Sequence, residues 1–405
     1  MRPLLLSVLL LTPLLRAAEP FLEKIDLFTA GEDPAYKVYH IPGVVVTSKG
    51  TVLAWCEARK RASGVSDWDD IRILLRRSTD DGKTWDAPRS IADVPGPKTK
   101  NPSALKMKNV DPADVTYNNP VLIADRDGTV HMLFCLEYMR CFYQRSLDDG
   151  LTWSTPTEIT AAFEGFRKGH DWKVLATGPD HGIQLRNGRL LVPVWISAGT
   201  GNNGHHPSVT GTIFSDDHGA TWHAGDIAVP TNETWIDPNE TTAAELGDGR
   251  VMLNVRSESK PNRRIIVTSP DGATGWSTPR FDDALFEPIC MGSLVRYDFG
   301  GQHLLLFSNP HNLEKAKGGA TPGGYRDRKN LSVKLSPDDG LTWPTSKTVE
   351  KGYGMYSDLA VTPAGTILCL YGRSGAGQGQ AKGLPAFTGG RLTLARFNLE
   401  WLKQP

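Results

Sequence analysis

The sequence predicts an all-β fold, a six-bladed β-propeller, on the basis of three observations. An octet with the pattern S-x-D-x-G-x-T-W occurs four times, and a fifth, degenerate copy keeps its Ser, Asp and Trp in register. Each copy follows a run rich in β-forming residues. The tryptophans of successive copies are 68, 69, 54 and 67 residues apart, enough for a four-stranded unit with its loops. Strand–turn–strand units repeated along a whole chain are typical of propellers.

The octets have the chemistry of hairpin turns. The five copies begin at Ser78, Ser146, Ser215, Ser269 and Ser336. Their Ser and Asp side chains can bond backbone N–H groups of the turn, and their Gly is expected in a left-handed conformation. Thr and Trp should begin the next strand, with the indole packed against neighbouring structure. Such octets occur in several unrelated propellers, so they indicate a fold and not a function.

The spacing of the octets also predicts how the chain is divided. Dividing residues 19–405 by about 64, the mean interval between the tryptophans, gives six blades, one of which lacks the octet. We expect that blade to be closed by pairing between an N-terminal strand and the C-terminal strand at 391–397. No linker, low-complexity tract or charge block interrupts the chain, so residues 19–405 are expected to form a single catalytic propeller domain.

Residues 1–18 have the features of a signal peptide. Arg2 supplies positive charge, an apolar run extends from Leu4 to Leu15, and Ala17-Ala18 offers a small-residue cleavage site. The alternative is a buried first strand or helix. The run is too short to span a bilayer and no other segment approaches that length, so no membrane span is predicted. We therefore expect a protein that is secreted or periplasmic, and a monomer.

Charge and cysteine content exclude several classes of partner. Lys+Arg and Asp+Glu both number 45, and this balance predicts no nucleic-acid partner. The five cysteines are too scattered for a disulfide framework, so buried free thiols are expected, although Cys135 and Cys141 could pair. The cysteines lack metal-ligand spacing, and His205-His206 has no ligand-spaced partner, so no metal and no cofactor is predicted.

Segments between the octets resemble those of the exo-α-sialidase (neuraminidase) family, and the likeness runs from about residue 26 to residue 402. The matching segments include Cys56-Glu-Ala-Arg59, Ser66-Asp67-Trp68, Arg76-Arg77-Ser78, Asn239-Glu240, Asn254-Val-Arg256-Ser257, Arg328-Lys-Asn330-Leu331 and Tyr356-Ser357-Asp-Leu359. Their order along the chain, interleaved with the octets, makes the resemblance specific.

The resemblance implies a retaining hydrolase in which Tyr356 is the nucleophile, Glu240 its base, and Asp67 the general acid and then base. The chemistry fits a sialic acid, whose carboxylate on the anomeric carbon would repel a carboxylate nucleophile more than a neutral phenol. Asp67 would need a raised pKa to hold its proton. The alternatives are a packed tyrosine, an exposed acidic loop around Asp67 and a surface glutamate.

The family clamps the substrate carboxylate with three arginines, because a guanidinium group pairs with a carboxylate through two parallel bonds. Arg256 and Arg328 match the second and third, with Arg326 a competitor for Arg328. Arg59 is implied as a further substrate contact. Surface or strand-capping roles are the alternative for both clamp residues.

The first arginine of the clamp is replaced by His40, in Tyr39-His-Ile-Pro. The glutamate that normally holds that arginine is also missing, since Gly372 stands in its place. Losing both together is expected, because a buried glutamate without its arginine would be costly. His40 is expected to donate a hydrogen bond to the substrate, more strongly when protonated, or Arg373 to fill the space; alternatively His40 is merely packed after Tyr39.

Three functions follow from these readings. The first is an exo-α-sialidase that removes terminal sialic acid from sialylated glycans through a tyrosyl-enzyme intermediate. The second is a related hydrolase of another acidic (2-ulosonic) sugar, which would explain the altered corner at His40. The third is a propeller that binds glycans without cleaving them. The loop that carries His205-His206 is expected at the rim of the site, on the side of the leaving group.

Overall fold

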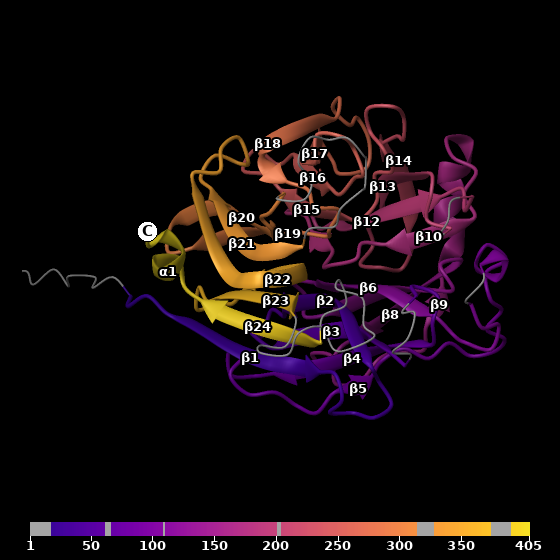
Figure 1. Ribbon diagram of the computed structural model, residues 1–405, viewed down its shortest axis with the longest axis horizontal. Coiled ribbons are helices and arrows are strands. Elements are labelled where there is room, and N and C mark those ends of the chain that lie inside the picture. Colours follow the sequence, from indigo (N-terminus) through magenta and orange to yellow (C-terminus); the bar gives the residue numbers. More distant parts are fainter. Residues whose placement is uncertain (1–17, 61–65, 108–109, 201–203, 314–327, 374–389) are drawn as a thin grey trace, which may run out of the picture.

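The computed structural model describes residues 18–60, 66–107, 110–200, 204–313, 328–373 and 390–405. Nearly all of the predicted signal peptide therefore lies outside the described residues. Within these ranges the regular secondary structure is mostly β-strand (Figure 1), with one short α-helix, α1 (Leu399–Lys403), and two 3-10 helices, η1 (Ala104–Lys106) and η2 (Thr160–Lys168). None of the helices in this part of the chain is long and apolar enough to cross a bilayer.

The strands form antiparallel sheets that follow one another around the molecule. Three sheets have four strands: β2 (Val38–Val46), β3 (Val52–Arg59), β4 (Ile71–Ser78) and β5 (Arg89–Ser90); β6 (Tyr117–Ala124), β7 (Val130–Leu136), β8 (Arg140–Ser146) and β9 (Thr157–Glu158); β15 (Thr241–Glu245), β16 (Val251–Val255), β17 (Arg263–Ser269) and β18 (Arg280–Phe286). A five-stranded sheet contains β10 (Val174–Thr177), β11 (Ile183–Gln184), β12 (Leu190–Ser197), β13 (Ser208–Ser215) and β14 (His223–Val229).

A seven-stranded sheet completes the propeller. In spatial order it holds β1 (Leu22–Thr29), β24 (Arg391–Phe397), β23 (Ile367–Arg373), β22 (Thr345–Val361), β21 (Lys329–Ser336), β20 (Gln302–Pro310) and β19 (Ser293–Phe299). Residues 345–353 of β22 pair with β21, whereas residues 354–361 pair with β23. The pairing of β1 with β24 confirms that the two terminal strands meet, and Figure 1 shows indigo β1 beside yellow β24.

The octets form turns between the third and fourth strands of their units, as predicted. In the first copy the Ser78 hydroxyl accepts a bond from the Gly82 N–H at 3.0 Å, and Gly82 has φ of 79°. The corresponding Ser–Gly bonds are 2.8 Å in the copies that begin at Ser146, Ser215 and Ser336. The octet tryptophans pack against the cores between sheets. One detail is wrong: the octet tryptophans do not begin the next strand, since each following strand starts after the Trp, in the first copy four residues later at Arg89.

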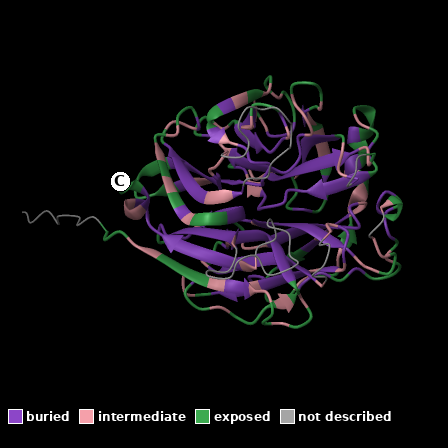
Figure 2. Ribbon diagram, in the orientation of Figure 1, coloured by how far each residue is buried: buried purple, intermediate pink, exposed green. Residues whose placement is uncertain are grey.

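Apolar side chains fill the spaces between neighbouring sheets. Figure 2 shows the strands largely buried and the outer loops exposed. Gly43 in β2 is required by this packing, because a Cβ atom there would lie 2.0 Å from the Trp55 ring. The Trp55 indole in turn donates a hydrogen bond to the Pro120 carbonyl at 3.1 Å, across to β6. All five cysteines are buried and free; Cys135 and Cys141 face each other across β7 and β8 without a disulfide.

Candidate active site

Four of the predicted site residues come from three sheets, with Glu240 and Arg256 in the same sheet. His40 lies in β2, Glu240 directly precedes β15, and Arg256 directly follows β16. Tyr356 lies in β22, where the register of its pairing with β23 shifts between residues 354 and 357. The local backbone is also irregular at His40-Ile41-Pro42, where Ile41 has φ of 54°, a strained value for a β-branched residue. The backbone is therefore irregular at two of these residues, His40 and Tyr356.

The closest contacts join Tyr356, Glu240 and Arg256. The Tyr356 hydroxyl donates to Oε1 of Glu240 at 2.6 Å, and Nη1 of Arg256 donates to the same hydroxyl at 2.7 Å. Arg256 Nη1 also forms an ion pair with Oε2 of Glu240. All three residues are buried. A phenol bonded to a carboxylate can pass its proton to that group, and the guanidinium can stabilise the phenolate that results.

The pKa of Tyr356 lies far above its usual range of about 10. Burial is the largest cause and the Glu240 carboxylate adds to it, while Arg256 and Arg328 act in the opposite direction. The phenol is therefore protonated at neutral pH. Ionisation of Tyr356 has to accompany the transfer of its proton to Glu240, because burial makes a free phenolate costly.

Both predicted clamp arginines contact Tyr356, Arg256 through the hydroxyl and Arg328 through the ring. The Arg328 guanidinium packs on the Tyr356 ring, 5.1 Å from its centroid, and its Nη2 donates to the Ile289 carbonyl at 2.6 Å. The Nε atoms of Arg256 and Arg328 and Nδ1 of His40 are buried without a hydrogen-bond partner among the described residues. Unpartnered buried donors cost free energy, so three such atoms near one tyrosine favour the binding of a ligand with acceptor oxygens.

His40 joins this group but is neutral. Its ring centroid lies 4.5 Å from that of Tyr356. The pKa of His40 is well below 6.5, because burial and the charges of Arg59 and Arg328 disfavour the imidazolium. Protonation at mildly acidic pH, which would strengthen a hydrogen bond from His40 to the substrate, is therefore disfavoured. If His40 contacts a substrate, it does so as a neutral donor or acceptor.

Asp67 is held by Arg59, which is shared between two carboxylates. Arg59 Nη2 pairs with Glu57 Oε2 at 2.6 Å, and its Nη1 pairs with Asp67 Oδ1 at 2.9 Å. Arg59 and Glu57 are almost fully buried, whereas the Asp67 side chain is 43% exposed. Burial raises the pKa of Asp67, but the charge and hydrogen bond of Arg59, together with His205 and His40, outweigh it and the pKa falls below the usual range. The expected raised pKa of Asp67 is therefore contradicted.

Arg373 is not part of this group. Its Nη2 pairs with Asp26 Oδ1 at 3.0 Å and its Nε donates to the Thr393 hydroxyl at 2.7 Å, so it faces β1 and β24. A Cβ atom at Gly372 would lie 3.2 Å from the Met355 methyl group. Met355, and not Arg373, thus lies beside the position where the resemblance expects a glutamate. The suggestion that Arg373 fills this corner is wrong.

Sequence reasoning missed part of the wall around Tyr356. Ile41, Cys290 and Met291 form a buried cluster with Tyr356. Cys290 and Met291 lie between β18 and β19 and belong to no motif, so no local pattern pointed to them. Pro42 gave no usable signal, because the residue before a proline is expected at negative φ, whereas Ile41 has φ of 54°.

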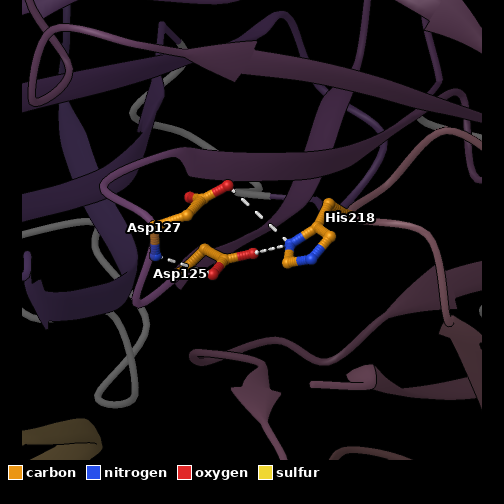
Figure 3. Close-up of side chains that lie close together, drawn as sticks. All are labelled: Asp125, Asp127 and His218. Atoms are coloured by element: carbon orange, nitrogen blue, oxygen red, sulfur yellow. Dashed lines mark hydrogen bonds and ion pairs between the residues drawn. The ribbon is translucent and has the colours of Figure 1, made fainter.

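Two groups elsewhere have the composition of metal sites. Figure 3 shows Asp125, Asp127 and His218, whose nearest ligand atoms lie within 4.8 Å of one another. Asp125 Oδ2 lies 2.8 Å from Nδ1 of His218 and 3.2 Å from Nε2 of His131. These bonds already give the buried carboxylate partners and connect the turn after β6 to the octet after β13. The second group is Asp180, His181 and Asp358, in which Nδ1 of His181 bonds to both carboxylates.

Comparisons with known proteins identify the family of the chain. Residues 67–369 match the BNR repeat-like domain family. A sialidase of Micromonospora viridifaciens is 30% identical over 96% of this chain, and Sialidase-2 of Rattus norvegicus is 30% identical over 87% of this chain and 92% of its own length. The solved structure of the Hadza microbial sialidase Hz136 has 25% identity and a TM-score of 0.67, covering 92% of this chain and 68% of that one.

The match to some relatives is partial in length. The chain spans 56% of the Micromonospora viridifaciens sialidase and 61% of a sialidase of Bacteroides fragilis. The Rattus norvegicus relative, in contrast, is matched almost throughout. The propeller, its octets and this match over most of both chains establish that the protein belongs to the sialidase family, whose repeats are of the BNR type.

Proposed function

We propose that this protein is an exo-α-sialidase, a retaining glycoside hydrolase that removes terminal sialic acid from glycoconjugates. The observation that carries the proposal is the bond of 2.6 Å between the Tyr356 hydroxyl and Glu240, with Arg256 bonded to both groups. A nucleophile with its own buried base serves bond cleavage, whereas binding alone does not need one. This distinguishes the proposal from a propeller that only binds glycans.

The reaction has two steps. In the first, the Tyr356 oxygen attacks the anomeric carbon while its proton passes to Glu240, and the bond to the leaving oxygen breaks as Asp67 protonates that oxygen. In the second, Asp67 takes a proton from water, the water oxygen attacks the same carbon, and the tyrosyl bond breaks as Glu240 returns its proton. Two displacements at one carbon give retention.

The low pKa of Asp67 suits the second of these steps better than the first. Its ionised form, favoured by Arg59, is ready to act as the base of the second step. The first step needs the protonated form, which becomes more abundant as the pH falls. We therefore expect substrates with poor leaving groups to be cleaved best at acidic pH, since they depend most on the acid.

The carboxylate of the substrate is proposed to lie between Arg256 and Arg328. Among the described residues, their Nε–H groups are buried donors without partners, and Nδ1 of His40 is a buried ring nitrogen without one. A charge-assisted bond contributes about 1.5–3 kcal/mol, so losing one arginine of the family's three weakens binding about 10- to 100-fold. His40 and Gly372 favour a second candidate, a hydrolase of another acidic 2-ulosonic sugar whose carboxylate needs fewer charged contacts.

We further propose that the propeller has six blades and that its chain is exported. The divided pairing of β22, with β21 along one half and β23 along the other, supports counting the seven-stranded sheet as two blades. The charge and apolar run of residues 1–18 support a signal peptide and a secreted or periplasmic location. A single domain over 19–405 and a monomeric state complete this proposal.

A Tyr356→Phe variant tests the catalytic proposal. Turnover of a fluorogenic α-sialoside should fall about 10³-fold or more, because the nucleophile is gone. Binding of free sialic acid should stay within a few-fold, because Arg256 and Arg328 remain. Tyr353→Phe, on the same strand but partly exposed, is the control and should keep full turnover. Undiminished turnover by Tyr356→Phe would refute the assignment, and release from deaminated analogues alone would favour the second candidate.

A further inference from the structure

His205 lies beside the candidate acid/base. Its Nδ1 is 4.0 Å from Oδ2 of Asp67, while Arg59 occupies the other oxygen, Oδ1. Asp67 belongs to the segment before β4 and His205 to the segment before β13, so two distant parts of the chain meet here. Oδ2 is the carboxylate oxygen that Arg59 leaves available for proton transfer. Any group that controls the position of Oδ2 therefore acts on the chemistry attributed to Asp67.

The ring of His205 is held in place by three aromatic side chains. Its centroid lies 4.9 Å from that of Tyr138, 5.1 Å from that of Trp195 and 5.6 Å from that of Trp68. These three residues are each 3% exposed or less. The Asp67 side chain, in contrast, is 43% exposed. A fixed imidazole thus stands next to a carboxylate that has room to move.

The surroundings of the ring favour the tautomer with its proton on Nδ1. Nε2 of His205 is buried and has no hydrogen-bond partner within the described part of the chain, so a proton there would be an unsatisfied donor. A proton on Nδ1 points towards the negative charge of Asp67. A movement of about 1 Å by Asp67 closes the gap to hydrogen-bond distance, and catalytic bonds are commonly long before a substrate is bound.

We propose that His205 is a positioning residue for Asp67, donating its Nδ1–H to Oδ2 so that the ionised carboxylate is oriented towards the water of the second step. This inference rests on the proposed sialidase function. A neutral imidazole suits the task because it orients the carboxylate without adding a second cation to that of Arg59. Burial lowers the pKa of His205 to about 4, which keeps the ring neutral.

Two variants separate this role from simple packing. His205→Asn places an amide N–H close to the position of Nδ1 but fills less of the aromatic pocket. His205→Phe fills the pocket but has no donor. On an aryl α-sialoside, whose first step is fast, we expect His205→Phe to lower kcat about tenfold or more and His205→Asn to keep at least about half of it. KM should fall with kcat in His205→Phe, because the tyrosyl intermediate accumulates.

Azide gives a second readout that a structural role would not change. Azide attacks without losing a proton, so it bypasses a missing base. We expect azide to raise kcat of His205→Phe and of Asp67→Ala, but not that of the wild type or of His205→Asn. The acidic limb of the kcat–pH profile should also move to higher pH in His205→Phe. Other charged or titratable groups also face this pair and affect the pKa values that the profile reports. They are Arg59, His40, His206, Glu240 and Arg256.

The outcomes are distinct. Any one of three results would overturn the proposal. They are an unchanged kcat in His205→Phe, a loss of kcat in His205→Asn alone, and a loss in His205→Phe that azide does not reverse. Absence of turnover by the wild-type protein on any α-sialoside would overturn the sialidase function and this inference together. Should His205→Phe fail to fold, as judged by its thermal transition, His205→Leu takes its place in the same assays.

Discussion

Replacing His40 by arginine tests how this site recognises an anion. His40 is 6% exposed and lies against the Tyr356 ring. The charges of Arg59, Arg328 and Arg256 already lower the pKa of His40, so they would also repel a guanidinium at this position. The family's usual arginine is accompanied by a glutamate, which Gly372 does not supply. His40→Arg therefore buries a charge without a partner.

The expected effects have opposite signs for stability and for binding. An uncompensated buried charge costs about 3–5 kcal/mol, a large part of the 5–15 kcal/mol by which typical domains are stable. The carboxylate of bound sialic acid would supply the missing partner. A charge-assisted pair contributes about 1.5–3 kcal/mol, so His40→Arg should bind sialic acid about 10- to 100-fold more tightly than the wild type.

Urea denaturation with and without sialic acid measures both effects. The midpoint of His40→Arg should lie below that of the wild type without ligand, and the ligand should raise it more in the variant. His40→Gln is the control. It keeps a neutral donor, so it should neither lower the midpoint without ligand nor increase the rise that the ligand causes. Adding Gly372→Glu to His40→Arg should restore stability, with a coupling free energy of about 0.5–3 kcal/mol. Displacing the flexible end of Met355 makes room for the new side chain.

One result would refute this reasoning. If His40→Arg folds with the stability of the wild type and binds sialic acid no more tightly, position 40 does not face the substrate carboxylate. Tighter binding of a different acidic sugar by the wild type than by the variant would instead support the second candidate function.

Three further predictions concern the base, the packing and the turns. Glu240→Gln should lower kcat about 10²- to 10⁴-fold, because Tyr356 loses its proton acceptor, as steady-state assays would show. Gly43→Ala should cost about 3 kcal/mol or more in urea denaturation, because its Cβ would displace the Trp55 ring. Asp125 raises the pKa of His218, so this pair stabilises the fold below pH 6.5 and less as the pH rises through the folded pKa. Thermal transitions of His218→Ala should therefore show a deficit at pH 5.5, limited by solvent screening to about 1 kcal/mol, that disappears at alkaline pH.

The fold was predictable because its determinants are local. Each octet uses side chains within five residues of Ser to satisfy the backbone of its own turn, as the bond from the Gly82 N–H to Ser78 shows. Local bonds of this kind leave a pattern in the sequence wherever they recur. The number and spacing of the turns then followed directly, as did the pairing of the strand at 391–397 with an N-terminal strand.

The site was predictable only in part, because its residues depend on contacts between distant segments. The meeting of Tyr356 with Glu240 was implied by resemblance, since 116 residues separate them. The resemblance did not give the charge states of the site residues. His40 is neutral because of its burial together with the charge of Arg59, and Arg59 also favours the ionised form of Asp67. No sequence pattern reports that Arg59 lies beside both residues. Met355 was missed for the same reason.

The balance of charge in the cluster explains how the site can lose an arginine and still favour an anion. Three guanidinium groups face three carboxylates: Arg59, Arg256 and Arg328 against Glu57, Asp67 and Glu240. The net charge of these six groups is therefore zero and does not by itself attract an anion. Among the described residues, however, Arg59 and Arg256 have carboxylate partners, whereas Arg328 has only the Ile289 carbonyl. Because a buried cation without a counter-charge is costly, an incoming carboxylate gains most beside Arg328. Replacing an arginine–glutamate pair by His40 and Gly372 leaves this imbalance intact, since both members of the pair are removed together.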